Sequence, residues 1–323
     1  MELTTIPACK HRTAALARPV RRLTPAVLGL CAAAAFIGLV SPAPAQEAQR
    51  RQYEATPVQP LAPLAPQATL PQAEDDEIGN QFLLKRRAAI PQFSISGDAQ
   101  YFYNDNPRLQ DSGSAAGDLV FVGSSTLAWN PTWIKGANLS AFARQQFFRY
   151  NSNSNLDFDS LAGGITMGTA VRDWFNISYG FTGTRLESRS TDAVFYKEGD
   201  GSLVFSRAEK FGQRFALPYG YTFDYYLADP GNYTRATHGL FAGLNCAITP
   251  KLLAQVFYRL QYEDYQTVSR SDQAHIISAT MVYYITDWAS VRAFMSWSTN
   301  HSTQNFSYDV LNSGAGLSLV WRF

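Results

Sequence analysis

The 323-residue sequence has little cysteine, little charge and, beyond its first segment, no long apolar run. Two of its three cysteines lie in the first 45 residues, so the remainder cannot form a disulfide within the chain. Charged residues make up only 16% of the chain, and 27 basic against 26 acidic residues give a net charge of +1. This balance offers no electrostatic basis for nucleic-acid binding. The hydrophobic fraction of 46% argues against a disordered chain.

Residues 1–45 have the pattern of a secretory signal peptide. Basic residues come first, an apolar stretch follows over 26–40, and Ala43-Pro44-Ala45 fits the small-x-small cleavage pattern. The apolar stretch is shorter than the roughly 18–20 residues that a membrane-spanning helix needs, which favours a cleaved signal over an anchor. The sequence therefore predicts export through the inner membrane, with cleavage after Ala45.

Residues 46–90 are rich in proline, glutamine and alanine. This composition predicts a semi-extended linker on the periplasmic side. Within it, acidic residues 75–77 and basic residues 85–87 flank a short apolar stretch. A short helix over 76–88, with charges that suit both ends of its dipole, and a solvated run of charges explain this pattern equally well.

From residue 91 to residue 323 the sequence changes character, because all but three of the 44 aromatic residues lie there. No run of about 18 apolar residues occurs in this region, which excludes helical membrane spans. Apolar residues instead alternate with polar or small ones. The alternation is clearest over 175–181, 254–262, 277–285, 291–297 and 317–323.

Long strands with one apolar face predict a transmembrane, antiparallel, up-and-down β-barrel, because lipid cannot satisfy the edge of an open sheet. Four short connections are expected, at 130–132, 172–173, 249–251 and 286–287, and they alternate with the longer polar stretches 151–155, 228–234, 265–272 and 300–305. The spacing of the tryptophans gives roughly 38 residues per hairpin and hence about 12 strands. Poor alternation over 188–213 leaves a range of about 10–14 strands open.

A water-soluble β-sandwich is the alternative all-β fold. Its strands typically run about five or six residues, which is shorter than the segments seen here. In a barrel the apolar set contacts lipid, and aromatic residues near the strand ends form girdles at the two membrane interfaces. Cys246 alternates with Leu240 and Leu244, so we expect it on the lipid side.

The last strand places apolar residues at alternate positions and ends on the final residue of the chain: Leu317, Leu319, Trp321 and Phe323. This ending resembles the terminal signal that outer-membrane barrels of Gram-negative bacteria present to their assembly machinery. Residues 91–323 as a whole resemble the porin-like barrel superfamily, and no motif selects a subfamily. The resemblance implies insertion among the phospholipid and lipopolysaccharide of the outer membrane, with both ends of the barrel domain in the periplasm.

If the apolar set faces lipid, the alternate set faces the lumen. The charged members of that set are Asp98, Arg144, Asp224, Arg259, Glu263, Arg292 and Arg322. Such a mixed lining either screens small hydrophilic solutes, with a mild preference for anions, or fills a narrow barrel with salt bridges. We therefore expect a porin-like passive channel without a cofactor. The alternative is a structural or surface-interaction barrel without transport, whose exposed loops would be 104–117 and 187–201.

An outer-membrane hydrolase is a third class. Outer-membrane phospholipases also have twelve strands and carry histidine, serine and asparagine at the barrel edge, and the segment beginning Asn300-His301-Ser302 is similar in composition. Adjacent strand residues point to opposite faces, so these side chains lack the mutual reach that catalysis needs. Glu263 and Asp264, and Asp272 with His275, could mimic the acidic pairs and histidine of an outer-membrane protease. We assign no catalytic residue, and no histidines have metal-site spacing.

Overall fold

The computed structural model describes residues 42–55, 91–111, 116–131, 137–171, 174–304 and 306–323. These residues form one α-helix, α2 (Pro42–Ala55), and a closed antiparallel barrel of twelve strands. Most of the predicted signal peptide, and the whole of the predicted 76–88 helix, lie outside the described residues. The strands are β1 (Phe93–Asn104), β2 (Asp118–Trp129), β3 (Asn138–Tyr150), β4 (Phe158–Val171), β5 (Phe175–Ser188), β6 (Ala193–Phe211), β7 (Phe215–Asp229), β8 (Arg235–Thr249), β9 (Leu252–Tyr265), β10 (Ser271–Tyr284), β11 (Ala289–Ser302) and β12 (Tyr308–Arg322).

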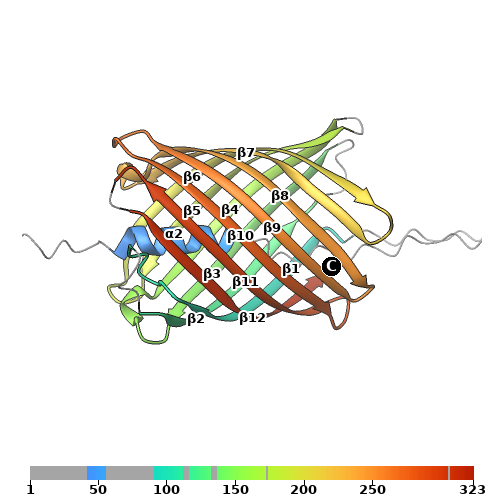
Figure 1. Cartoon of the computed structure of the whole chain (residues 1–323). Helices are drawn as coiled ribbons and strands as arrows, with labels where there is room; N and C mark the ends of the chain where they lie inside the picture. The colour runs from blue at the N-terminus through green and yellow to red at the C-terminus, as the bar shows by residue number, and fades with distance from the viewer. Residues whose placement is uncertain (1–41, 56–90, 112–115, 132–136, 172–173, 305) are drawn as a thin grey trace, which may run out of the picture. The chain divides into compact units, whose positions relative to one another are not determined.

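Each strand pairs with its neighbours in sequence, and β1 pairs with β12 to close the barrel (Figure 1). At the seam the backbone N–H of Phe93 donates to the carbonyl of Phe323 at 3.1 Å, and the N–H of Phe323 donates back at 3.0 Å. Closure leaves no strand edge unpaired, as a barrel in lipid requires. The predicted fold class and the number of about twelve strands are confirmed.

At one end of the barrel, called here the short-turn end, the connections run two to four residues, except that between β2 and β3, which spans 130–137 and is longer than the short connection expected at 130–132. At the other, called the long-loop end, they run from four to 13 residues. A further short turn, between β6 and β7, lies in the poorly patterned region 188–213. The expected exposed loop 187–201 is wrong, because β5 and β6 stay paired as far as Ser188 and Ala193. The outward positions Lys197, Gly199 and Gly201 are not apolar, so alternation cannot reveal the strand there.

The outer face of the barrel carries large exposed apolar side chains in the alternate positions that the sequence predicted. Tryptophan and phenylalanine gather near the short-turn end, and tyrosine is prominent toward the long-loop end: Trp174, Trp288, Trp321, Phe211 and Phe323 on the first, Tyr101, Tyr103, Tyr225 and Tyr262 on the second. A soluble monomer rarely exposes an apolar patch above a few hundred Å². This surface therefore fits lipid, and the sandwich alternative is excluded by the closed barrel.

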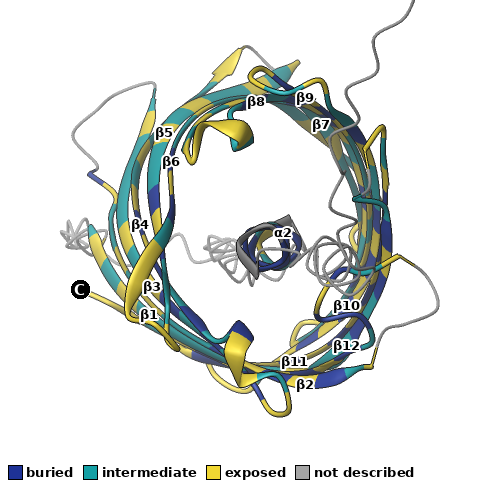
Figure 2. Ribbon diagram, turned by 90° about the vertical axis from the view of Figure 1, so that its left-hand side faces the viewer, coloured by how far each residue is buried: buried dark blue, intermediate teal, exposed yellow. Residues whose placement is uncertain are grey.

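Helix α2 lies inside the ring of strands when the barrel is viewed along its axis (Figure 2). Residues 46–55, which composition assigned to a semi-extended linker, form most of this helix. Alanine, glutamine, glutamate and arginine favour helix, and the i,i+4 pairs Glu47–Arg51 at 2.8 Å and Arg50–Glu54 at 2.6 Å add to it. The predicted cleavage point after Ala45 falls within α2. No helix of the described residues is long and apolar enough to cross a membrane.

The inner face of the barrel is not polar throughout, which corrects the simple picture of a polar lumen. A cluster of buried apolar side chains lines one wall toward the long-loop end: Phe102, Val120, Val122, Phe148, Tyr150, Leu156, Phe158, Leu186, Tyr196 and Phe294. Tyr53 of α2 packs edge-on against Phe148, with ring centroids 5.6 Å apart. A second cluster joins Ala45 and Ala48 of α2 to Leu109, Tyr308 and Val310. Apolar contacts therefore contribute to seating the helix.

Candidate functional site

Helix α2 runs along the lumen from the long-loop end toward the middle of the barrel. Near its start, the Gln46 side chain donates to the carbonyl of Leu156 at 2.9 Å, and Asn104 donates to Gln49 at 2.9 Å. Leu156 lies in the connection between β3 and β4, and Asn104 ends β1. Near the helix end, Tyr53 contacts Asp98, which lies in the middle of β1. The helix therefore occupies the long-loop half of the lumen.

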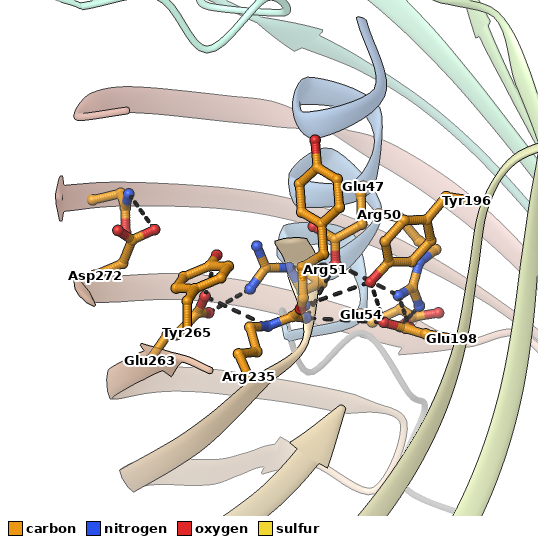
Figure 3. Close-up of polar contacts among 12 residues, drawn as sticks. Glu47, Arg50, Arg51, Glu54, Tyr196, Glu198, Arg235, Glu263, Tyr265 and Asp272 are labelled. Atoms are coloured by element: carbon orange, nitrogen blue, oxygen red, sulfur yellow. Dashed lines mark hydrogen bonds and ion pairs between the residues drawn. The ribbon is translucent and has the colours of Figure 1, made fainter. Parts of the chain in front are cut away.

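Eight charged side chains join α2 to the barrel wall, and we call them the lumenal charge network. The helix supplies two acids and two bases, and the wall supplies two of each. Figure 3 labels all of them except Arg144. The members are Glu47, Arg50, Arg51 and Glu54 on α2, and Arg144, Glu198, Arg235 and Glu263 on the strands. Helix and wall are each neutral within this network, so they complement one another pair by pair.

Arg235 of β8 is the centre of the lumenal charge network and is fully buried. Its guanidinium lies 3.1 Å from Glu47, 3.6 Å from Glu263 and 3.9 Å from Glu198. The ring of Tyr226 lies beneath it, with 4.0 Å from guanidinium carbon to ring centroid. One wall arginine thus links both wall carboxylates to an acid of the helix.

The two helix arginines each reach one wall carboxylate. Arg50 pairs with Glu198, and Arg51 pairs with Glu263. A phenol completes each site, since Tyr196 donates to Glu198 at 2.6 Å and Tyr265 donates to Glu263 at 3.1 Å. Buried charges are strongly unfavourable unless they are both paired and hydrogen-bonded. Both wall carboxylates meet these conditions, whereas the buried Nε atoms of Arg50 and Arg235 have no hydrogen-bond acceptor among the described residues.

The protonation states of the Arg50 and Tyr53 side chains follow from these contacts. Burial lowers the pKa of the Arg50 guanidinium, but the carboxylates of Glu54, Glu198 and Glu47 outweigh burial and raise that pKa well above its ordinary value. Burial raises the pKa of the Tyr53 phenol, and the negative charge of Asp98 raises it further. Arg50 therefore stays charged and Tyr53 stays neutral at any pH that a cell meets.

A second charged group lies just beyond the end of α2. Arg292 of β11 donates two hydrogen bonds to Asp98 of β1, at 2.5 and 2.7 Å, and the Ser318 hydroxyl donates to Asp98 at 2.6 Å. The Gln100 amide donates to the Tyr53 hydroxyl at 2.7 Å. The bidentate geometry fixes the Asp98–Arg292 pair, and Tyr53 connects it to the helix.

The seven charged residues predicted to line the lumen fall into three groups. Four of them contact α2 or the pair beneath it: Asp98, Arg144, Glu263 and Arg292. Asp224 and Arg259 occupy the inward set of β7 and β9, and no hydrogen bond or ion pair joins either to α2 among the described residues. Arg322 lies exposed at the end of β12. That these seven residues line a conducting path stays a prediction.

The residues proposed for hydrolysis do not come together. His301 is exposed on the outer face, whereas Asn300 is buried on the inner side and donates to the carbonyl of Phe306 at 2.8 Å. Glu263 lies in the lumenal charge network, while its neighbour Asp264 points outward. His275 is partly buried and hydrogen-bonds Tyr258 at 2.9 Å. No group of three or more potential metal ligands occurs within the described ranges.

Three residues of the predicted assembly signal lie on the outer face of β12, the strand that closes the barrel, and Phe323 follows directly after it. Leu317, Leu319, Trp321 and Phe323 are exposed, Trp321 to 69%. Recognition by an assembly machinery stays a prediction.

Comparison with known proteins finds similarity of fold alone. No protein-family model and no curated protein matches the sequence. Among solved structures, an outer membrane channel from Pseudomonas putida F1 is 9% identical with a TM-score of 0.49, covering 76% of this chain and 100% of that one. LpxR from Salmonella typhimurium is 9% identical, with a TM-score of 0.43 and coverage of 69% and 99%. The translocator domain of the autotransporter NalP from Neisseria meningitidis is 10% identical, with a TM-score of 0.40 and coverage of 72% and 90%.

Proposed function

We propose that this chain is an outer-membrane channel for small hydrophilic solutes, closed at its long-loop half by α2. The observation that carries the proposal is how α2 is held. Its hydrogen bonds and ion pairs to the wall all involve side chains, and no backbone-to-backbone hydrogen bond joins α2 to a strand within the described residues. The helix can therefore leave the lumen without breaking any part of the closed sheet.

The outer surface supports the membrane location. Its apolar belt and the aromatic residues toward both ends match the requirements of a barrel in lipid. Outer-membrane barrels have short turns on the periplasmic side and longer loops outside. By this rule the short-turn end faces the periplasm, and α2 lies toward the external side.

A structural barrel without transport is the second candidate. The burial of the lumenal charge network favours it. A permanent salt-bridged filling would keep the lumen closed under all conditions. The two candidates differ in whether loss of one helix-to-wall pair opens a path for ions.

Conductance across planar lipid bilayers tests the proposal. We expect the full chain to conduct in brief, infrequent openings, and the Arg51→Gln variant to conduct more often, because Glu263 loses its helix partner. Arg185→Gln is the matched control, since its pair with Glu187 is exposed on the barrel surface. The control should conduct as the unaltered chain does.

Two results would contradict the channel. One is the absence of single-channel events in the full chain and in Arg51→Gln, with both proteins correctly folded. The other is equal conductance in Arg51→Gln and Arg185→Gln, because α2 would then not control the path. Either result would favour the structural barrel.

A further inference from the structure

A cavity of about 430 Å³ lies below α2, toward the short-turn end. Tyr53 and Glu54 of the helix form one side of it, and inward residues of β11, β12, β1, β2 and β3 form the rest. These five strands are consecutive around the barrel, so the cavity lies against one continuous part of the wall. Its size falls within the roughly 300–1,000 Å³ of small-molecule sites.

The charged groups of this cavity cancel one another. Glu54 pairs with Arg144, and Asp98 accepts two hydrogen bonds from Arg292. Each guanidinium is thus already bound to a carboxylate, and the four charges sum to zero. An anion or a cation entering the cavity would have to compete with an existing pair, and an uncharged solute would not.

Two glutamines leave hydrogen-bond acceptors without partners. The side-chain oxygens of Gln100 and Gln146 are buried, and neither has a hydrogen-bond donor among the described residues. Both residues line the cavity and are at least 98% buried. A buried amide oxygen without a donor is unfavourable by about 1–3 kcal/mol. A hydroxyl group of a bound solute would relieve that cost once the glutamine side chain turns its oxygen toward the cavity.

Hydroxyl groups line the same cavity as these two acceptors. Four serine and threonine side chains line the cavity and form no hydrogen bond with another described residue: Ser96, Ser124, Thr126 and Ser140. The pairing of the strands brings them together, since Ser96 lies opposite Thr126 and Ser124 lies opposite Gln146. Hydroxyls both donate and accept, so they match a solute whose own groups do both.

One aromatic ring completes the lining. Phe142 of β3 faces the cavity beside Arg144, whose guanidinium carbon lies 5.8 Å from the ring centroid. Its ring gives the otherwise polar site an apolar surface. A ring-shaped solute with hydroxyls at its edge and C–H groups on its face fits both kinds of surface.

We propose that this cavity binds an uncharged polyhydroxylated solute the size of a mono- or disaccharide. The inference rests on the proposed channel and names the class of solute that the channel admits. Gln100 and Gln146 accept hydrogen bonds from the solute hydroxyls, the serines and Thr126 donate to them, and Phe142 contacts the sugar face.

Isothermal titration calorimetry on the full chain in detergent micelles tests the site without requiring conduction. The probes are glucose, maltose, glucuronate and glucosamine, which share a sugar ring and differ in charge or length. We expect glucose or maltose to bind, and both charged sugars to bind at least about fivefold more weakly than glucose.

The variant Gln146→Leu removes one acceptor while keeping a similar shape. It should weaken binding of the uncharged sugar about fivefold, which corresponds to the loss of one hydrogen bond. Gln273→Leu is the matched control, because Gln273 is exposed on the outer face. Thr126→Val is a second test of the lining that also keeps side-chain shape.

Each outcome decides the proposal. Equal or tighter binding of glucuronate or glucosamine overturns the uncharged class, and unchanged binding in both Gln146→Leu and Thr126→Val overturns the site. A chain that conducts in bilayers but binds none of the sugars keeps the channel and refutes this site. A chain that binds glucose or maltose but never conducts keeps the site and refutes the channel.

Discussion

Replacing Arg50 with leucine should loosen α2 without disturbing the barrel. The side chains of Arg50 and Glu198 are each 3% exposed, so the substitution leaves a buried carboxylate without its closest cation. Removing one partner of a buried ion pair costs about 3–5 kcal/mol. Glu198 keeps the Tyr196 hydrogen bond at 2.6 Å and a distant contact with Arg235 at 3.9 Å, so we take the lower figure.

A loss of about 3 kcal/mol corresponds to a shift of roughly 150-fold in the equilibrium between docked and released helix. The control is Arg185→Leu. Arg185 is 50% exposed and Glu187 is 40% exposed, and surface pairs of this kind contribute about 0–1 kcal/mol. The control should therefore leave the docking of α2 unchanged.

Amide hydrogen exchange measures this equilibrium directly, because an amide of α2 exchanges when the helix leaves the lumen and unwinds. We expect the amides of residues 46–55 to exchange about 100-fold faster in Arg50→Leu. The amides of β8 to β12 should keep their protection, because the sheet hydrogen bonds are unaffected.

Exchange in Arg50→Leu within about threefold of the unaltered chain would refute the reasoning, since α2 would then be held by its apolar contacts. Faster exchange in the strands as well would refute it differently. That result would mean that Arg50 supports the barrel as a whole and not the helix alone.

Three other substitutions test the wall. Gly316→Ala should lower the free energy of unfolding in detergent by about 1–3 kcal/mol, because a Cβ there would lie 2.9 Å from Gln100 and 3.0 Å from Arg292. Gly97→Ala is the control and should be tolerated, because its Cβ would lie 4.0 Å from the nearest atom. Equal effects of the two substitutions would contradict this reasoning. Arg259→Glu in the Arg51→Gln background should move the reversal potential toward cations, and an unchanged potential would place Arg259 off the conducting path. Val256→Arg on the lipid face should cost about 2–4 kcal/mol in a urea titration in lipid, and no cost would argue against lipid contact there.

The barrel could be predicted from sequence because the same local pattern, an alternation of apolar and polar residues, recurs in strand after strand. A strand between lipid and lumen must alternate, and segments such as 277–285 and 291–297 show the alternation directly. The long strand β6 was hidden for a physical reason. Its Lys197, Gly199 and Gly201 lack the apolar side chains from which alternation is recognised.

The helix in the lumen could not be recognised by composition. Prolines from position 57 onward dominate the segment and indicate a linker, yet residues 46–55 contain none. The spacing of Glu47 and Arg51 was the local sign of a helix. That sign says nothing about where the helix docks, because its wall partners come from distant strands.

Two of the residues that hold α2, Arg235 and Glu198, escape sequence reasoning for the same reason, whereas Glu263 and Arg144 are among the predicted lining charges. Arg235 lies at the border of the expected loop 228–234, and Glu198 lies within the poorly patterned region 188–213. Only the register of β6, β8 and β9 brings these side chains together with Glu263. Of the seven predicted lining charges, the structure assigns four to contacts with α2 or the pair beneath it.

The balance of charge on α2 determines its response to an electric field. Its side chains carry two positive and two negative charges, so moving the helix along the barrel axis does no net electrical work on them. Cleavage after Ala45 would add one positive charge at the new α-amino group, which titrates near pH 8. A potential of 100 mV acts on one charge with up to about 2.3 kcal/mol. Voltage dependence of channel opening would thus report whether the helix carries a free amino terminus.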